Sequence, residues 1–481
     1  MSKKNHLISF PKPYDILTEK PSIKKYLKYL KFFGPGAVVA SLTIGQGQLI
    51  LGPQIGAWAG FALLWLITIN VGSYIIGYIG CRFTMLSGIG VMDLFAFKTR
   101  KGWLNWLFII IMIIFIPIFT ASIMTTLGQA LAWVFDFGNY LIWGVAFCLL
   151  AGVLVLSGRY RLLEYTQVFF VAALGIGAIV SVIYFQPDLL EMLPNFFKIG
   201  IVPDSYPGWV SGFPSVYDTP IPLLLLGYVG TLTFTIITLV GYLGWIKVKK
   251  WGIFKDRNNP EDFSIKLLNS FKKEGRISYL SSDKNEVNKS KMLLKPLVID
   301  LILAFVIVSI VSSAYMIGGA TLLRAEQVLP KDANLVQEQA LIFTFLADWL
   351  KPLFQVSMVF ALFGTVYAGF EAGARMLYET AKGINKEITD IKYRKFMFYL
   401  LVYLLVAGVP IAYLMYSGLS VILMLTLTLM FIGYIGVIMY GVGVLYLSQK
   451  VLPEKYRFGK IGLFLSILGI VVLMTPLLAF L

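Results

Sequence analysis

Runs of about 20 mostly apolar residues recur along this 481-residue chain, and they constrain its fold more than any other feature. An α-helix needs about 20 apolar residues to cross the hydrocarbon core of a bilayer, so each run predicts one membrane span. We predict eleven spans, with ends defined to within several residues, at about 36–60, 62–81, 103–128, 141–157, 165–185, 220–246, 296–320, 353–378, 397–416, 419–446 and 461–480. The expected fold class is therefore an all-α, multi-pass protein of the cell membrane.

The composition and motif content exclude most soluble and enzymatic classes. Apolar residues make up 58% of the chain and charged residues 14%, whereas soluble proteins average about 45–50% and 25%. No phosphate-binding G-x-x-x-x-G-K-[ST], nucleophile elbow G-x-S-x-G or metalloprotease H-E-x-x-H occurs, so neither ATP-driven transport nor hydrolysis is expected. The cysteines Cys81 and Cys148 lie in or beside apolar runs and predict no disulfide framework. We expect neither an enzyme nor a bound cofactor.

The positive charge indicates topology rather than a nucleic-acid partner. The formal net charge is +16, yet only Lys198, Arg324, Lys331 and Lys351 fall outside if the N-terminus is cytosolic. The other 37 of the 41 lysines and arginines then lie on the inner side. Cytoplasmic loops of membrane proteins carry this excess, so an N-in, C-out orientation is predicted.

Three segments lie outside the spans. Residues 1–33 hold eight lysines and no apolar core of signal-peptide length, which predicts a basic cytosolic tail. The outer loop 186–219 is rich in prolines and aromatics and is expected to fold as a cap. The inner loop 247–295 has 13 basic and 6 acidic residues. It is interpreted as a solvated linker, with contact to anionic membrane lipids as the alternative.

The first span, GPGAVVASLTIGQGQLILGPQIGAWAG, has a polar interruption near its middle, at Gly45, Gln46, Gly47 and Gln48. Glycine weakens a helix, and unwound backbone is tolerated at membrane depth only where it is buried in protein or lines a cavity. Secondary transporters build substrate sites from such broken helices, at corresponding positions of inverted repeats. The alternative is that the glycines are packing notches.

The sixth span should then be interrupted too, if spans 1–5 (about 34–185) and 6–10 (about 220–446) are inverted repeats, with an extra helix at about 461–481. It contains Gly227 and Gly230, followed by Thr231, Thr233 and Thr235. Threonines that bond to their own helix carbonyls are the alternative. The predicted substrate-binding residues are Gly45, Gln46, Gly47, Gln48, Gly230, Thr231 and Thr233.

Acidic residues within spans are candidates for a proton or ion pathway, because a carboxylate at membrane depth is costly. Glu371 lies in the eighth span with Arg375 four residues later, so the two share a helix face and can form a structural ion pair instead. Asp300 is a further candidate, although an interfacial or structural pair is the simpler interpretation, as it is for Glu164.

At this point the sequence resembles a known family. Gly34-Pro35-Gly36, the broken first span, the segment Arg159-Tyr160-Arg161-Leu162-Leu163-Glu164 and eleven spans with N-in topology resemble NRAMP-type (natural resistance-associated macrophage protein) divalent metal transporters. The resemblance covers residues 34–481 in layout. It implies a LeuT-type fold of two inverted five-helix repeats plus an eleventh helix, and proton-coupled import of manganese or ferrous iron.

The family's metal-site motifs are altered in this chain. The family has D-P-G-N in the first span and A-x-x-M-P-H in the sixth. Here Gly45 replaces the aspartate, only Gly47 matches, and Gln48 stands in place of asparagine, while the sixth span has neither methionine nor histidine. Gln48 and Gln46 remain as candidate metal ligands through their amide oxygens. Thioether sulfur favours softer transition metals and carboxylates offset a cation's charge, so an altered site is expected.

Two functions stay open from the sequence. The first is a secondary transporter of divalent metal or other cations, by alternating access and with proton coupling as an option. The second is a transporter of a neutral or organic solute on the same scaffold, because amides and hydroxyls suit a polar molecule. Either way the partners expected are the transported cation or small solute, protons and membrane lipids.

Overall fold

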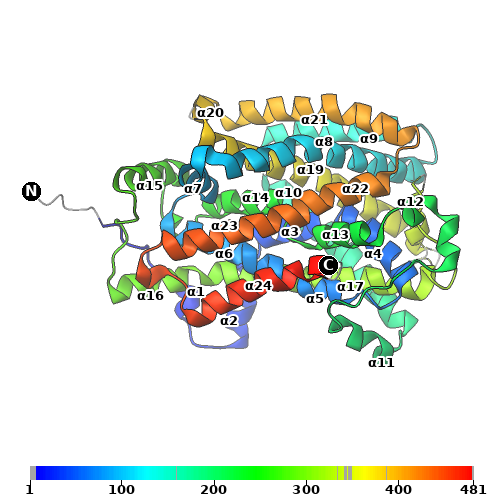
Figure 1. Ribbon diagram of the computed structural model, residues 1–481, viewed down its shortest axis with the longest axis horizontal. Coiled ribbons are helices and arrows are strands. Elements are labelled where there is room, and N and C mark those ends of the chain that lie inside the picture. The colour runs from blue at the N-terminus through cyan, green and yellow to red at the C-terminus, as the bar shows by residue number, and fades with distance from the viewer. Residues whose placement is uncertain are drawn as a thin grey trace, which may run out of the picture.

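The structure is a computed structural model that describes residues 7–158, 160–332, 334–340, 344, 349–385 and 387–478. It is a bundle of helices, most of which run along the longest axis of the molecule (Figure 1). Over these ranges there is no β-strand, and the only strand-like pairing is an isolated bridge between Ile8 and Leu280.

The longer helices supply the bundle and the shorter ones connect them. The helices of eight or more residues are α3 (Pro35–Ile44), α4 (Gln46–Ala59), α6 (Val71–Ser87), α7 (Val91–Lys98), α8 (Trp103–Phe135), α9 (Tyr140–Ser157), α10 (Tyr160–Phe185), α13 (Ile221–Leu232), α14 (Ile236–Val248), α15 (Pro260–Glu274), α16 (Lys284–Leu293), α17 (Lys295–Gly318), α19 (Leu350–Ile384), α21 (Tyr393–Tyr416), α22 (Val421–Leu429), α23 (Gly436–Lys450) and α24 (Lys460–Leu478). The shorter α-helices are α1 (Asp15–Thr18), α2 (Ile23–Lys28), α5 (Trp65–Ile69), α11 (Leu189–Met192), α12 (Pro214–Tyr217) and α20 (Glu387–Asp390).

Nine helical segments within the described part of the chain are long and apolar enough to cross a membrane. They are Trp65–Ser87, Arg100–Phe135, Tyr140–Ser157, Ile221–Phe254, Lys284–Leu323, Leu350–Ile384, Tyr393–Tyr416, Val421–Lys450 and Lys460–Leu477. The broken pair α3–α4 occupies the first predicted span and α10 the fifth. Arg159 lies outside the described residues. For residues 160–168 only the backbone is described, so the side chains of the RYRLLE segment cannot be compared with the prediction.

Two helices are broken near the middle of the bundle, as the sequence predicts. Gly45 has a non-helical ψ of −140° and separates α3 from α4. Residues 233–235 separate α13 from α14, and the side chain of Thr235 accepts a hydrogen bond from the Thr238 amide to cap α14. A third irregularity is the π-helix Met430–Ile435, which joins α22 to α23.

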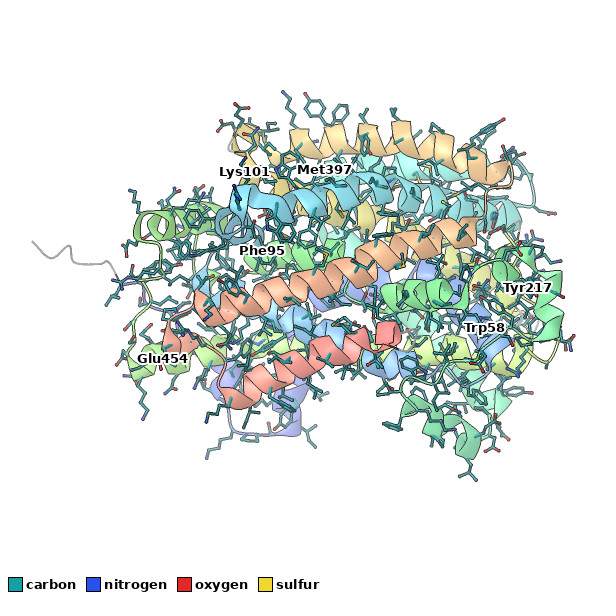
Figure 2. All side chains as sticks on the ribbon, viewed as in Figure 1. Trp58, Phe95, Lys101, Tyr217, Met397 and Glu454 are labelled. Carbon is teal, nitrogen blue, oxygen red and sulfur yellow. The ribbon has the colours of Figure 1, made fainter. Side chains whose placement is uncertain are left out.

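The two ends of the bundle carry different connections (Figure 1). The helices α7, α15, α16 and α20 lie toward the end from which the N-terminus projects, and α11 and α12 lie toward the opposite end. Side chains follow the same division in Figure 2, where Lys101 and Glu454 lie toward the first end and Trp58 and Tyr217 toward the second. The predicted inner loops and the outer loop 186–219 therefore occupy opposite ends.

The basic loop 247–295, predicted to be an inner loop, is largely helical and packed against the bundle. Ser264 donates a hydrogen bond to the Gly88 carbonyl at 2.7 Å, and the Tyr279 hydroxyl donates to the Ser87 carbonyl at 2.6 Å. Further along, Glu286 accepts a hydrogen bond from the Phe10 amide at 2.6 Å, which attaches the N-terminal segment. These contacts fix both the loop and the tail at one end of the bundle.

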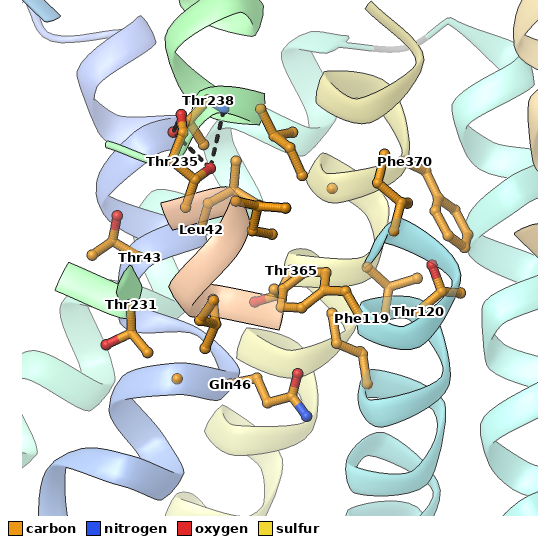
Figure 3. A pocket seen from close by; sticks show the side chains of 18 residues that line it. Leu42, Thr43, Gln46, Phe119, Thr120, Thr231, Thr235, Thr238, Thr365 and Phe370 are labelled. Carbon is orange, nitrogen blue, oxygen red and sulfur yellow. Dashed lines mark hydrogen bonds between the residues drawn. The ribbon is translucent and has the colours of Figure 1, made fainter. Parts of the chain in front are cut away.

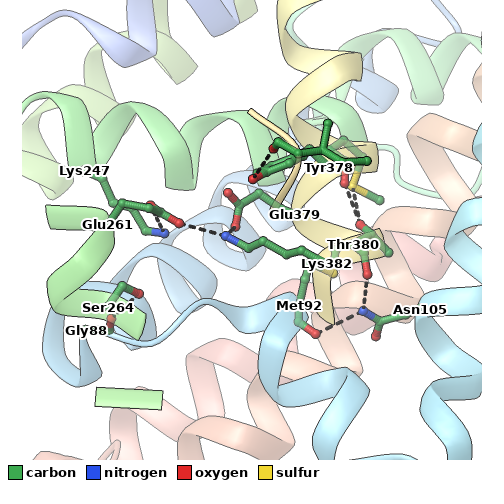
Figure 4. Close-up of polar contacts among 12 residues, drawn as sticks. Gly88, Met92, Asn105, Lys247, Glu261, Ser264, Tyr378, Glu379, Thr380 and Lys382 are labelled. Atoms are coloured by element: carbon green, nitrogen blue, oxygen red, sulfur yellow. Dashed lines mark hydrogen bonds and ion pairs between the residues drawn. The ribbon is translucent and has the colours of Figure 1, made fainter. Parts of the chain in front are cut away.

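Glu261 of this loop connects two bundle helices (Figure 4). Its carboxylate pairs with Lys247 of α14 and Lys382 of α19, each at 2.8 Å, and Lys382 also pairs with Glu379 at 2.7 Å. Burial raises the pKa of the Glu261 carboxyl, but the two ammonium groups outweigh this effect, so the pKa lies well below its ordinary range. The ionised carboxylate is thus the form that the fold stabilises.

Replacing Glu261 should destabilise the protein at neutral pH. Glu261→Gln leaves two nearly buried lysines without this partner, and because the Glu261 side chain is 45% exposed we expect a loss of only about 1–2 kcal/mol. A carboxyl whose folded pKa is depressed contributes its full stabilisation above its unfolded pKa of about 4.3, and this contribution declines as pH falls from there toward the depressed folded pKa. Thermal unfolding in detergent at pH 7 and pH 3 measures both effects.

The matched control is Glu454→Gln, an exposed glutamate at the same end of the bundle. It should leave the unfolding temperature unchanged at both pH values. If Glu261→Gln and the control behave alike at pH 7, the ion pairs do not hold α14 and α19 together.

Candidate functional site

A cavity lies where the two broken helices meet (Figure 3). About 50 Å³ of it is open to the centres of water molecules, which is room for a few waters, since one needs about 10–15 Å³. Figure 3 places Thr235 and Thr238 at one end of the cavity and Gln46 at the other. The polar lining residues are Thr43, Gln46, Thr120, Thr231, Thr235, Thr238 and Thr365, and the remainder are glycines and apolar residues.

Gln46, the first residue of α4, is oriented by α8. Its amide nitrogen donates to the Thr126 hydroxyl at 2.8 Å, and its amide oxygen accepts from the Ser122 hydroxyl at 3.3 Å. The side chain is fully buried, and an unpaired amide in such a place would be costly. Gln46 therefore lines the cavity in one fixed orientation.

Gln48 connects the two broken helices to each other. Its amide nitrogen donates to the Thr231 hydroxyl at 2.7 Å, and its amide oxygen accepts from the Tyr228 hydroxyl at 3.2 Å. Thr231 in turn donates to the Tyr228 carbonyl at 2.8 Å. Both partners belong to α13, so the amide of Gln48 fixes α4 against α13, although Gln48 itself is not among the lining residues.

The glycines of the site are required by close packing. A Cβ atom on Gly45 would lie 2.0 Å from the Thr365 hydroxyl oxygen, and one on Gly47 would lie 2.3 Å from Cγ2 of Thr231. A Cβ atom on Gly230 would lie 2.2 Å from the Leu429 carbonyl oxygen. These positions therefore accept only glycine without rearrangement. The absence of side chains here lets α4, α13, α19 and α22 approach one another closely at the breaks.

Thr233 stabilises the break between α13 and α14. Its hydroxyl donates to the Gly433 carbonyl in the π-helix that follows α22, and it also lies 3.2 Å from the Gly230 carbonyl. The residue is buried but does not line the cavity. Of the predicted substrate-binding residues, Gln46, Gly47 and Thr231 thus line the cavity, and the other four pack directly behind it.

The cavity has no charged lining residue. In the described part of the chain there is also no group of three or more His, Cys, Asp or Glu side chains that could hold a metal ion. The available donors are hydroxyl, amide and backbone carbonyl oxygens. The arrangement can therefore bind a small polar molecule or a cation that keeps much of its water shell, but it cannot neutralise a bare divalent ion.

Glu371 and Arg375 lie apart from this cavity. Arg375 donates to one carboxylate oxygen of Glu371 from Nε at 2.9 Å and from Nη2 at 2.6 Å. Nε1 of Trp245, on α14, donates to the other carboxylate oxygen at 3.1 Å. Glu371 directly follows Gly369 and Phe370, which do line the cavity, but neither Glu371 nor Arg375 is a lining residue. Glu371 thus connects α19 to α14 without facing the cavity itself.

Asp300 holds the start of the first broken helix. Its two carboxylate oxygens accept from the amides of Gly34 at 2.9 Å and Gly36 at 2.7 Å, and it also accepts from the Tyr242 hydroxyl. A Cβ atom on Gly36 would lie 2.8 Å from the Asp300 carboxylate. The Gly34-Pro35-Gly36 segment therefore fits against a buried carboxylate on α17, while α14 supplies the third donor.

Several lining threonines were not predicted from the sequence. Thr43, Thr120 and Thr365 come from α3, α8 and α19, and Thr238 follows the capping residue Thr235. Each of the first three is a hydroxyl within an apolar span, a pattern that also arises when threonine bonds to its own helix. These threonines face the same cavity only because of how their helices pack, so the sequence alone does not show it.

Comparison with known proteins identifies this architecture. Residues 36–481 match the family described as natural resistance-associated macrophage protein-like, or Nramp. The chain belongs to the Nramp family. It is thus a multi-pass membrane transporter rather than an enzyme. No curated protein matches the chain.

Solved structures show the fold of this Nramp-family chain. The Eremococcus coleocola manganese transporter, in complex with an aromatic bis-isothiourea substituted compound, has a TM-score of 0.65 at 16% identity, covering 100% of this chain and 90% of its own. Mhp1, a nucleobase-cation-symport-1 family transporter, has a TM-score of 0.53 at 14% identity, covering 100% and 93%. MhsT in complex with L-phenylalanine has a TM-score of 0.50 at 15% identity, covering 92% and 97%. The predicted LeuT-type fold is confirmed.

Gly45→Ala should destabilise the Nramp-family fold and should be partly rescued by a second change. The added Cβ would overlap the Thr365 hydroxyl, and overpacking of this kind costs about 1–3 kcal/mol. Thr365→Ala removes that hydroxyl, so the double variant should recover part of the loss. Thermal unfolding of the four proteins in detergent measures the coupling.

Gly369→Ala is the control, because no neighbouring atom lies within 4 Å of its added Cβ. It should be neutral or slightly stabilising, since alanine is the better helix former. Equal losses in Gly45→Ala and in its double variant with Thr365→Ala would show that the break is not packed against Thr365.

Asp300→Asn should weaken the start of α3. An asparagine turns an N–H₂ group toward one of the two glycine amides, so a buried donor loses its acceptor at a cost of about 1–3 kcal/mol. Tyr242→Phe removes only the hydroxyl donor and should cost less. Hydrogen exchange of residues 34–40 checks the local effect, and unchanged protection in Asp300→Asn would contradict this role.

Proposed function

We propose that this Nramp-family chain is a secondary active transporter that moves divalent metal cations across the cell membrane by alternating access. The observation that carries the proposal is the cavity at the junction of two broken helices, lined by oxygen donors from α3, α4, α8, α13, α14 and α19. Secondary transporters bind coupling ions and substrates at such junctions. The structural similarity to a manganese transporter supports a metal cation as the cargo.

The chemistry of the lining favours hard cations that keep part of their hydration shell. Hydroxyl, amide and carbonyl oxygens suit such ions, and magnesium-like ions dehydrate reluctantly. Because no carboxylate lines the cavity, a fully dehydrated divalent ion would remain uncompensated in a medium of low dielectric constant. The space in the cavity accommodates waters that the cation retains. The side-chain oxygens of Gln46 and Thr231 would serve as ligands, and Gln48 is a further candidate ligand.

The broken helices also provide dipoles at the cavity. The last carbonyls of α3 and α13 lack helical N–H partners, and the C-terminal end of a helix carries partial negative charge. The partial negative charge at these helix ends supplies an electrostatic attraction for a cation, which the uncharged side chains do not supply. Alternating access then corresponds to movement of the broken helices against the remaining bundle.

Proton coupling, in this proposal, would depend on Glu371 rather than on the cavity itself. Its carboxylate lies between Arg375 and Trp245 and links α19 to α14. Protonation would weaken the hydrogen bond that Glu371 accepts from Trp245 and so loosen α14, one of the broken-helix segments at the cavity. Asp300 is the second candidate, through its contact with α3.

A neutral or organic solute is the alternative cargo, and the uncharged lining favours it. Hydroxyl and amide groups can orient a small polar molecule, while the apolar lining residues, among them Phe119 and Phe370, can contact its hydrocarbon part. The 50 Å³ open to water centres limits the size of such a molecule in this conformation.

Uptake into proteoliposomes should separate these functions. We expect saturable uptake of Mn²⁺ or Mg²⁺, with Ca²⁺ and a panel of small polar solutes as competitors. Gln48→Ala removes both hydrogen bonds between Gln48 and α13. We expect it to weaken cation binding by about 1 kcal/mol, which raises the half-saturation concentration about fivefold. Glu371→Gln should mainly reduce the dependence of uptake on a proton gradient.

Gln54→Ala is the matched control, because Gln54 is buried on the same helix, α4, but does not line the cavity. It should retain the cation affinity of the unmodified protein. If no divalent ion is taken up or bound at low millimolar concentration, the metal proposal fails. Saturable uptake of a polar solute in the same vesicles would then establish the alternative.

A further inference from the structure

The segment just before the first broken helix forms an amphipathic helix on the flank of the bundle. Helix α2 continues into the 3₁₀ turn Tyr29–Phe32, and α3 begins at Pro35, three residues later. Figure 1 shows α1 and α2 along the lower flank of the bundle, in the half nearer the N-terminus. Because the chain enters its first span at α3, this helix lies at the level of the membrane surface.

One face of this helix is apolar and uncovered. Its residues follow the i, i+3, i+4, i+7 spacing of a helical stripe. The exposed fractions are 81% for Ile23, 57% for Tyr26, 63% for Leu27 and 56% for Leu30. Four large apolar side chains on one short helix are unusual on a surface that faces water, and they indicate an interaction site.

The neighbouring face is basic. Lys24 and Lys31 are seven residues apart, so they lie on the same side of the helix, and both are exposed. Among the described residues neither has an acidic partner within ion-pair distance, whereas Lys28 pairs with Glu19 at 2.9 Å. Lys25 points inward instead and donates to the carbonyl of Glu19.

The third face attaches the helix to the protein. Phe32 is buried and its ring contacts that of Tyr14, with the ring centroids 5.4 Å apart. Two residues later the Gly34 amide donates to Asp300. The helix is therefore held in one rotational position, with its apolar and basic faces both turned away from the bundle.

We propose that residues 23–31 bind the surface of an anionic membrane leaflet. The apolar stripe of Ile23, Tyr26, Leu27 and Leu30 inserts among the acyl chains, and Lys24 and Lys31 contact the anionic headgroups. Interfacial helices with lysines beside an apolar face bind membranes in this way. A water-soluble partner protein fits less well, because the stripe adjoins the point at which α3 enters the bilayer. The leaflet thereby positions the start of the first broken helix.

Site-directed spin labelling of the full-length protein in vesicles tests this proposal. Cys81 and Cys148 are buried, so Leu27→Cys can be labelled selectively. In phosphatidylcholine mixed with phosphatidylglycerol, we expect the nitroxide to be accessible to oxygen and protected from a water-soluble nickel chelate. Val406→Cys, exposed on the bilayer-facing α21, and Asn269→Cys, exposed on α15, are the membrane and water controls.

The anionic component is tested by charge removal. Lys24→Gln and Lys31→Gln should each lower the ratio of inserted to free nitroxide by about fivefold in the mixed vesicles. Lys266→Gln and Lys284→Gln remove the same charge from exposed positions on α15 and α16 and should leave it unchanged.

Three results would contradict the proposal. A nitroxide at Leu27 that is as accessible to the nickel chelate as the one at Asn269 would show that the stripe faces water. A nitroxide protected from both oxygen and the chelate would show that a protein surface, such as a second copy of the chain, covers it. If insertion is the same in pure phosphatidylcholine as in the mixed vesicles, and if neither Lys24→Gln nor Lys31→Gln changes it, the lysines do not bind anionic headgroups. None of these readings requires transport activity.

Discussion

Backbone polar groups cannot remain unpaired inside a membrane, and two helices of this protein are interrupted where that constraint is strongest. The structure meets it with contacts from helices distant in sequence. Thr233 bonds to a carbonyl of the π-helix, and the amide of Gln48 bonds to Thr231 across the two broken spans. Gly45 allows Thr365 to approach the break directly. These contacts hold the broken helices together, and the cavity lies where the breaks meet.

The bonds that hold the breaks together also determine the chemistry of the site. Gln46 and Gln48 each direct both ends of their amides to protein partners, so in this conformation neither is free to act as a ligand without exchanging a hydrogen bond. A cation would therefore compete with Thr126 or Thr231 for the same group. Binding through either amide would therefore require a helix movement that releases it, which is compatible with alternating access.

Much of the architecture could be predicted from the sequence, because it depends on local properties. Apolar runs located the spans, and the glycines at 45 and 47 located the first break. The sequence could not show that Trp245 would join Glu371 and Arg375, or that the hydroxyls of Thr43, Thr120 and Thr365 would converge, since both depend on how distant helices pack. From the sequence, the loop 247–295 is interpreted as a polar linker. Its buried contacts, such as that of Ser264 with Gly88, involve single residues in a basic stretch and leave no sequence pattern.

The carboxylate of Asp300 limits how the first broken helix can move. It binds two backbone amides, those of Gly34 and Gly36 at the start of α3, and it does so from α17, a different part of the bundle. The opposite end of α3 stops at Gly45, which has no side chain to restrict rotation. A displacement of α3 that pivots at Asp300 would have its largest amplitude at the cavity. A sideways tilt of the Gly45 end of α3 would open the site. Any larger displacement of α3 would require α17 to move with it.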